Sequence, residues 1–169
     1  MNTTCRNGQL REKIIFICPT WRLGLLTDTE SLSIKDGFEN SPYFLFYNGL
    51  LNNERLLAKA TEKGYKICFY PHRMMKNAKK RFVCDRDAII NGDSFSYTEV
   101  FRRGALLVTD YSSVQFDFSY LKKPVIYCQF DKDEFFSSHT CGQGYMDYEQ
   151  DGFGPVCYDL DSAVDTICR

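Results

Sequence analysis

The chain lacks the features by which many nucleotide-binding, metal-binding and membrane proteins are recognised. It has no glycine-rich Walker loop, and no G-x-G-x-x-G sequence follows an apolar run, so neither a P-loop nor a dinucleotide site is indicated. No apolar run approaches the roughly 18 residues of a transmembrane helix, and there is no secretory signal. We therefore expect a chain that does not cross a membrane.

A basic excess is also missing. The formal net charge is -1 over 169 residues, whereas nucleic-acid-binding domains are usually basic, so we expect no nucleic-acid partner. One local basic cluster stands out, 76-KNAKKR-81. We favour its interpretation as a solvated helix face, and contact with an anionic partner is the alternative.

The chain has eight cysteines, but no two of them have the C-x-x-C spacing of a zinc or redox site. Cys18, Cys68 and Cys128 lie in apolar runs, where a free thiol behaves as a small apolar group. We expect all eight to be reduced, which suits a cytoplasmic protein, and we expect no metal and no cofactor. Peripheral contact with the inner face of the plasma membrane stays open.

Short apolar runs alternate with helical patterns along the chain. Strand-like runs occupy residues 14–18, 43–48, 65–70, 88–90, 106–110 and 125–128, with a last one near 155. Helical patterns occupy residues 52–64, 96–103 and 113–123 and the C-terminal end, where Asp161 or Ser162 is the expected cap; residues 23–42 and 131–153 are expected to be irregular. The alternation predicts an α/β fold with a Rossmann-like, doubly wound parallel sheet. We expect a flexible lead-in over residues 1–13 and a single domain over residues 14–169.

Polar residues follow three of the predicted strands directly. They form the clusters 19-PTWR-22, 71-PHR-73 and 109-TDYSS-113. Ligands of doubly wound sheets bind beyond the carboxyl ends of the strands, so we expect these clusters to meet at one edge of the sheet.

The last cluster has the residue types of a phosphate site. Ser112 and Ser113 stand where a strand passes into a helix, and a helix start offers free N–H groups and a partial positive charge. The alternative is simple N-capping by a serine hydroxyl. Asp110 either caps the same helix or orients the turn.

The other two clusters supply a histidine and two cations. His72 can pair with a diphosphate when protonated or act as a general base when neutral, although a lone histidine is more often structural. Arg22 and Arg73 can clamp phosphate oxygens, or be ordinary surface cations.

Trp21 is expected to pack over the core, with stacking on a base or sugar as the alternative. Phe116, Phe118 and Leu121 have helical spacing and are expected to be core residues. Asp117 lies among these aromatics and is expected to brace the serine loop or bind ligand hydroxyls.

Taken together, these segments resemble the CDP-glycerol glycerophosphotransferase family, which includes the teichoic acid primases and polymerases. The resemblance lies in 19-PTWR-22, a strand that ends in Pro71-His72, 109-TDYSS-113 with 116-FDF-118, and 123-KPVIY-127; the late 154-GPV-156 agrees with it. It covers roughly residues 14–168. The family usually has a histidine followed by proline where this chain has the reverse order.

The resemblance implies the C-terminal half of a GT-B-type glycosyltransferase fold, the half that binds the nucleotide donor. It implies transfer of glycerol phosphate from CDP-glycerol to a polyol-phosphate or lipid-linked acceptor, without a built-in metal. It also implies that an N-terminal acceptor domain is absent here, so we expect the isolated chain to bind donor with little or no turnover. The catalytic candidate is His72; the donor-binding candidates are Arg22, Arg73, Thr109, Asp110, Ser112, Ser113 and Asp117.

Two alternatives remain. The first is a related GT-B transferase for another nucleotide donor, such as CDP-ribitol or a nucleotide sugar. The second is a non-catalytic α/β module that binds a phosphorylated ligand. A receiver-like domain would place an acceptor aspartate where Asp110 stands, but it would also need an acidic pair after the first strand, and 19-PTWR-22 supplies none.

Overall fold

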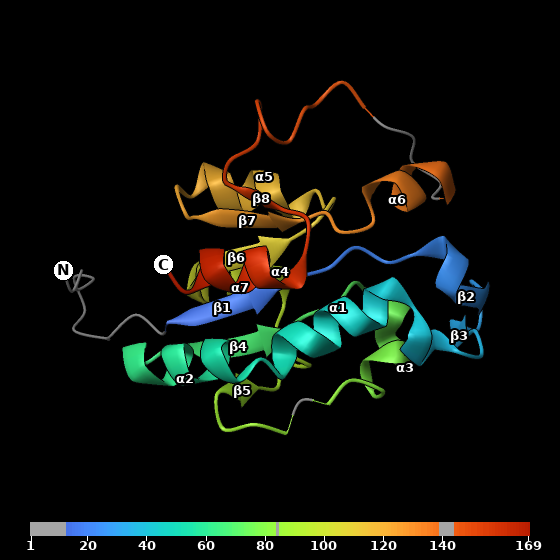
Figure 1. Cartoon of the computed structure of the whole chain (residues 1–169), viewed down its shortest axis with the longest axis horizontal. Coiled ribbons are helices and arrows are strands. Elements are labelled where there is room, and N and C mark those ends of the chain that lie inside the picture. Colours follow the sequence, from blue (N-terminus) through green and yellow to red (C-terminus); the bar gives the residue numbers. More distant parts are fainter. Residues whose placement is uncertain (1–12, 84, 139–143) are drawn as a thin grey trace.

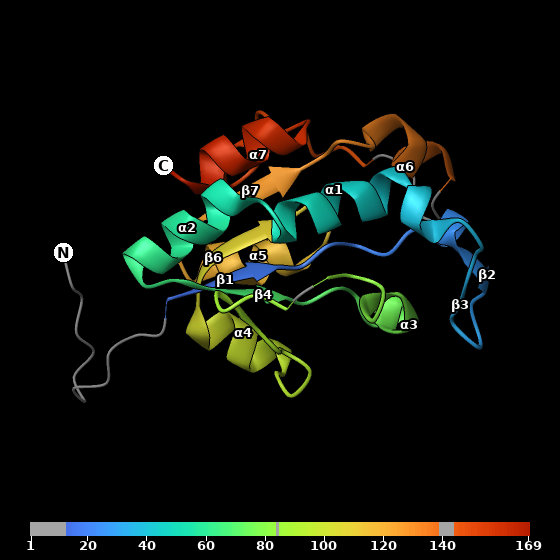
Figure 2. The ribbon, with the colours of Figure 1, turned by 60° about the horizontal axis from the view of Figure 1, so that its bottom comes forward.

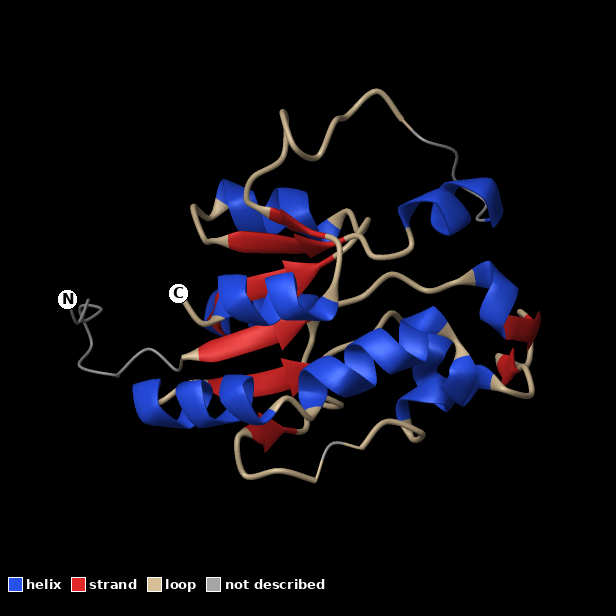
Figure 3. Ribbon diagram, in the orientation of Figure 1, coloured by secondary structure: helices blue, strands red, loops and turns tan. Residues whose placement is uncertain are grey.

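The computed structural model describes residues 13–83, 85–138 and 144–169. Its centre is a six-stranded sheet in the order β5-β4-β1-β6-β7-β8, with all neighbouring strands parallel (Figure 1, Figure 3). The strands are β1 (Ile14–Ile17), β4 (Lys66–Phe69), β5 (Ile89–Ile90), β6 (Gly104–Thr109), β7 (Val125–Cys128) and β8 (Val156–Cys157). The predicted α/β fold with a doubly wound parallel sheet is confirmed.

Helices cover both faces of this sheet (Figure 2). One face carries α1 (Pro42–Leu51), α2 (Glu54–Lys63) and α7 (Leu160–Ile167), and the other carries α4 (Tyr97–Arg103) and α5 (Val114–Tyr120). Successive residues of β1 point to opposite faces, so Ile15 packs in the first core cluster and Phe16 in the second. Burial on both sides explains why the strands read as continuous apolar runs.

The first large difference from the sequence prediction is 43-YFLFYN-48, which forms most of α1 and not a strand. Its buried residues recur with helical spacing, since Tyr43, Phe46, Tyr47 and Leu50 all face the core. The start signal is present as well: the Ser41 hydroxyl accepts from the Phe44 N–H at 3.2 Å, and proline follows at the first helical position. The aromatic residues favoured a strand, and tertiary packing against the sheet overrode that preference.

Both segments expected to be irregular contain regular structure. Residues 23–42 hold two short 3-10 helices, η1 (Leu23–Leu25) and η2 (Phe38–Asn40), and an antiparallel hairpin of β2 (Leu26–Asp28) and β3 (Ser33–Ile34). The segment from residue 131 begins with α6 (Lys132–Ser138). The last helix starts from an Asp159 cap, two residues before the expected Asp161.

Gly154, in the 154-GPV-156 segment, lies against the edge of β7. A Cβ atom at this position would stand 1.8 Å from the Val125 carbonyl oxygen, so no larger residue can be accommodated without moving the backbone. The close approach brings β8 beside β7, where the Tyr127 N–H donates to the Pro155 carbonyl at 2.9 Å.

The predicted lead-in over residues 1–13 lies outside the described residues, except for the exposed Lys13. Across the part of the chain that the structure does describe, no helix is both long enough and apolar enough to span a bilayer.

Candidate functional site

The loops that follow β1, β4 and β6 meet at the carboxyl edge of the sheet, as predicted. The His72 N–H donates to the Pro19 carbonyl at 3.2 Å, which joins the loop after β4 to the loop after β1. The Thr20 N–H donates to the Asp110 carboxylate at 2.9 and 3.1 Å, which joins the loop after β1 to the loop after β6. From β1 the chain adds β4 and then β5 on one side of β1 in the sheet. It then returns to the other side of β1 and adds β6, β7 and β8 in that order. The topological switch point therefore lies between β1 and β6, where doubly wound folds bind ligands.

Asp110 is the centre of this junction and has no exposed surface. Its carboxylate accepts from the Thr20 hydroxyl at 2.6 Å, from the Tyr111 N–H at 2.6 Å and from the Tyr47 hydroxyl at 3.3 Å. Thr109 is equally enclosed, and its hydroxyl donates to the Cys18 carbonyl at 2.8 Å. Their burial gives no support to the prediction that these two side chains touch the donor. In this structure they hold the loops together.

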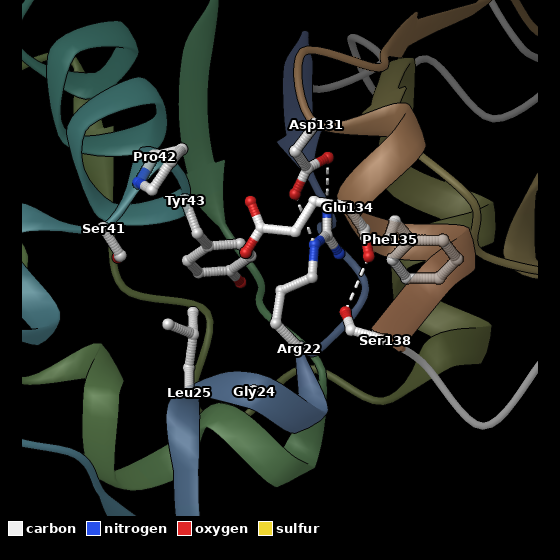
Figure 4. A pocket seen from close by; sticks show the side chains of 10 residues that line it. All are labelled: Arg22, Gly24, Leu25, Ser41, Pro42, Tyr43, Asp131, Glu134, Phe135 and Ser138. Carbon is white, nitrogen blue, oxygen red and sulfur yellow. Dashed lines mark hydrogen bonds and ion pairs between the residues drawn. The ribbon is translucent and has the colours of Figure 1, made fainter.

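Arg22 was predicted to be a phosphate clamp or a surface cation, and the structure shows it in a third role. Its Nε and Nη2 donate to the Asp131 carboxylate at 2.7 and 3.1 Å (Figure 4). Its Nη2 also donates to Asp110 at 2.9 Å. Its Nη1 donates to the Thr20 carbonyl at 2.8 Å. The residue is 7% exposed, so this guanidinium is occupied by protein groups and is not presented to a ligand.

Arg22 therefore ties together the ends of β1, β6 and β7. The rings of Tyr43, Tyr111 and Phe135 lie within 5.3 Å of its Cζ atom, and Tyr111 stacks on Phe135 at 3.9 Å between centroids. Burial by itself lowers the pKa of the Arg22 guanidinium, but the attraction of Asp110 and the hydrogen bond to Asp131 outweigh it, and the net shift is upward. The guanidinium therefore stays positively charged, as arginine does in proteins generally.

The two serines after Tyr111 are arranged differently. Ser112 is half-buried and Ser113 is exposed, just ahead of α5. Ser113 is the N-cap residue, but its side chain makes no capping hydrogen bond. Among the described residues, neither hydroxyl has a hydrogen-bond partner, so the simple capping alternative is not supported. Both hydroxyls stand beside the switch point with their hydrogen-bonding capacity unused.

His72 lies across the same edge, half-buried at the end of β4. Its ring stacks on Trp21, with centroids 6.4 Å apart and planes inclined by 23°. Its Nδ1 accepts from the Met74 N–H at 3.3 Å, which fits a neutral ring that carries its proton on Nε2. Trp21 packs on the core as predicted. Arg73 is exposed beside the histidine.

Asp117 and its aromatic neighbours differ from the sequence prediction. Asp117 is exposed on α5 and does not sit among buried rings. Phe118 is fully buried, whereas Phe116 is 51% exposed and Leu121 47% exposed, so only one of these three predicted core residues is in the core. Asp117 remains accessible to a ligand, and a role in binding hydroxyls stays a prediction.

Two cavities in the described part of the chain are lined by residues other than the serine pair and His72. A small cavity of about 60 Å³ lies between η1, the start of α1 and α6, with Arg22, Tyr43 and Asp131 in its wall (Figure 4). A larger one of about 300 Å³ lies between α2, α7 and the amino edge of the sheet. Over the described ranges, no three His, Cys, Asp or Glu side chains are grouped as metal ligands, and freedom from metal stays a prediction.

Asp131 and Tyr111 were not among the predicted site residues. Asp131 follows β7 closely, so the rule that polar residues after strands gather at one edge would have found it. Tyr111 stood inside a quoted cluster, but its hydroxyl contact with Asp131 at 3.3 Å joins residues from two different loops.

Comparison of the fold with solved structures shows the class of protein to which the chain is similar. It resembles the wall teichoic acid polymerase TagF with a TM-score of 0.63 and 21% identity, over 94% of this chain and 35% of that one. It also resembles the UDP-GlcNAc 2-epimerase of Methanocaldococcus jannaschii, with a TM-score of 0.52 and 16% identity, over 93% of this chain and 38% of that one. At these low sequence identities, the structural similarity shows only the fold, which is a Rossmann-like, GT-B-like unit.

Sequence comparison then defines the family. Residues 4–169 match the profile of the CDP-glycerol:poly(glycerophosphate) glycerophosphotransferase family, and the chain belongs to that family. It is 37% identical over 161 residues to the minor teichoic acid biosynthesis protein GgaB of Bacillus subtilis. The aligned region covers 92% of this chain and 17% of GgaB. It is 27% identical to the teichoic acid glycerol-phosphate transferase of Staphylococcus aureus, over 95% of this chain and 37% of that protein. The chain thus spans well under half the length of these relatives.

Proposed function

We propose that this chain is the donor-binding part of a transferase that moves glycerol phosphate from CDP-glycerol to a polyol-phosphate or lipid-linked acceptor. The product would be teichoic acid or a similar cell-surface polymer. Family membership over residues 4–169 supports the reaction class. The observation that carries the assignment to a site is the pair of unengaged hydroxyls on Ser112 and Ser113 at the switch point.

The diphosphate of the donor would lie over the start of α5. There the serine hydroxyls and backbone N–H groups can donate to phosphate oxygens. Arg22 contributes indirectly, because through Asp110 and Asp131 it fixes the position of the loop that carries the serines. The exposed guanidinium of Arg73 would approach the phosphates directly.

In the reaction, a hydroxyl oxygen of the acceptor forms a bond to the β-phosphorus of CDP-glycerol. The bond from that phosphorus to the bridging oxygen breaks, and CMP leaves with the electron pair. The developing charge on CMP is stabilised by donors already in place, which is the usual strategy for phosphoryl transfer. The Nε2–H of His72 is suited to this task, since its Nδ1 is already used by the Met74 N–H.

The proton lost by the acceptor hydroxyl needs a base, and we propose that parts of the enzyme beyond this chain supply it. This agrees with the chain covering only part of its relatives. The isolated chain should therefore bind CDP-glycerol without turning it over. We also propose that binding needs no metal ion, so that EDTA leaves the dissociation constant unchanged.

Calorimetric titration with CDP-glycerol, CDP-ribitol and UDP-glucose tests the proposal. We expect CDP-glycerol to bind most tightly, and Ser112→Ala to weaken it about tenfold, the effect of one lost hydrogen bond to a charged group. Ser137→Ala is the matched control, since Ser137 is an exposed serine on α6. Equal affinity for all three nucleotides, or no effect of Ser112→Ala, would contradict the assigned donor site.

A further inference from the structure

The basic cluster 76-KNAKKR-81 divides into two sets in the structure. Lys79 pairs with Asp93, and Arg81 pairs with Glu39 at 2.8 Å, so these two cations are neutralised by nearby acids. Lys76 and Lys80 are exposed, and within the described residues neither forms an ion pair. Among the described residues the cluster therefore retains two cations without a direct ion pair, although Lys76 lies close enough to Asp93 to help lower the pKa of that carboxyl.

Arg73 extends this unpaired set up to the candidate site. We call Arg73, Lys76 and Lys80 the basic strip. Their spacing of three and four residues places them on one side of the turns formed by η3 (Arg73–Met75) and α3 (Lys76–Lys79). The strip spans eight residues, and the seven steps from Arg73 to Lys80 correspond to roughly 10–14 Å along a helix axis.

The strip is held in a fixed relation to His72. The Met75 N–H donates to the His72 carbonyl at 2.8 Å, and the Met74 N–H donates to the His72 ring. The opposite side of the same turns is anchored, because Met75 and Ala78 are fully buried in the core. The cations consequently face outward, on a surface that begins at the candidate site.

We propose that the basic strip binds the phosphate groups of the acceptor, a polyanionic polyol-phosphate chain, and leads its end toward His72. This rests on the proposed function, since it assigns a surface to the acceptor of that reaction. A row of separated cations matches a polymer that carries one negative charge per repeat, and attraction over this range persists within a Debye length.

A lipid surface would also attract cations, but the structure favours the polymer. Helices that lie on membranes insert apolar side chains beside their basic residues. From residue 73 to residue 82 no large apolar side chain is exposed, and Val83 is the first that is. The strip offers charge without an insertable apolar face.

The test measures binding of fluorescently labelled, lipid-free poly(glycerol phosphate) to the chain at several salt concentrations. The variant Lys76→Ala/Lys80→Ala removes two strip cations and leaves Arg73 and His72 in place. Its control is Lys59→Ala/Lys63→Ala, which removes equal charge from α2 at the opposite edge of the sheet (Figure 1). We expect the strip variant to bind the polymer about tenfold more weakly at low salt, with a shallower salt dependence, and the control to match the native chain.

Three results would overturn the proposal. They are no binding of the polymer by the native chain, an equal loss in both double variants, or lysine-dependent binding to phosphatidylglycerol vesicles without binding to the polymer. The native chain is titrated with CDP-glycerol in parallel. If it binds the polymer but not CDP-glycerol, the result contradicts the donor-site assignment and leaves the proposal about the basic strip standing.

Discussion

Replacement of Arg22 by methionine tests the central claim about the site, that this arginine is a structural tie and not a ligand for phosphate. The change leaves the Asp110 and Asp131 carboxylates enclosed without their shared cation; their side chains are 0% and 6% exposed. Breaking a buried ion pair by removing one partner costs about 3–5 kcal/mol, a large part of the roughly 5–15 kcal/mol that stabilises a typical domain. For a chain of this size the melting temperature should fall by about 6–20 °C.

Urea denaturation followed by circular dichroism measures this loss. Arg81→Met is the matched control, since it breaks the Arg81–Glu39 pair, whose side chains are 39% and 48% exposed, and should cost at most about 1 kcal/mol. The double variant Arg22→Met/Asp131→Asn should regain part of the stability, because it removes one of the uncompensated charges. A cost below 1 kcal/mol for Arg22→Met, or a double variant less stable than Arg22→Met alone, would refute the reasoning.

Two further predictions concern a ring nitrogen and a helix cap. His72→Asn keeps an acceptor for the Met74 N–H but lacks the Nε2–H of the histidine ring. Calorimetric titration should show that this variant binds CDP-glycerol about tenfold more weakly than the native chain. If the variant binds with native affinity, His72 is not part of the donor site. Asp159→Ala should lower the melting temperature at pH 7, whereas Asp161→Ala, in the same turn but outside the cap, should not. The pKa of Asp159 is lowered by the Ser162 N–H and then the Ser162 hydroxyl, so its stabilisation exists above the ordinary aspartate pKa and is lost as pH falls through the folded-state value. An Asp159→Ala deficit that persists at pH 2 would contradict this origin.

Local signals predicted the helices that begin and end with strong caps. Asn53 accepts from the Leu56 N–H at the start of α2, and Gly64 ends that helix with a φ of 70°, as its sequence indicated. The Ser96 capping box likewise starts α4. These elements were predictable because a few neighbouring residues determine them.

Residues 43–48 were mispredicted for a physical reason. An aromatic run is compatible with a buried strand and with a buried helix, and its length alone does not separate them. The helix formed because its aromatic side chains pack against residues from distant segments: Phe44 of α1 meets Phe38 of η2 and Phe82 beyond α3, and these three ring centroids lie within 6 Å of one another. Packing between distant segments is not encoded in any short window of sequence.

The class of fold, the family and the edge of the sheet that holds the site could all be predicted from the sequence. Alternating periodicities and strand-end residues carry that information, and both are local. Which strand-end side chains are available to a ligand became clear only from the folded structure. Arg22 meets Asp110 across 88 residues and Asp131 across 109, and those contacts turn two predicted ligand-binding residues, Arg22 and Asp110, into internal partners. Ser112 and Ser113 stay available because, within residues 13–83, 85–138 and 144–169, the same packing leaves their hydroxyls without partners. A side chain is available to a ligand only if no other part of the chain already uses its hydrogen-bonding groups. That is decided when segments distant in the sequence come together in the fold.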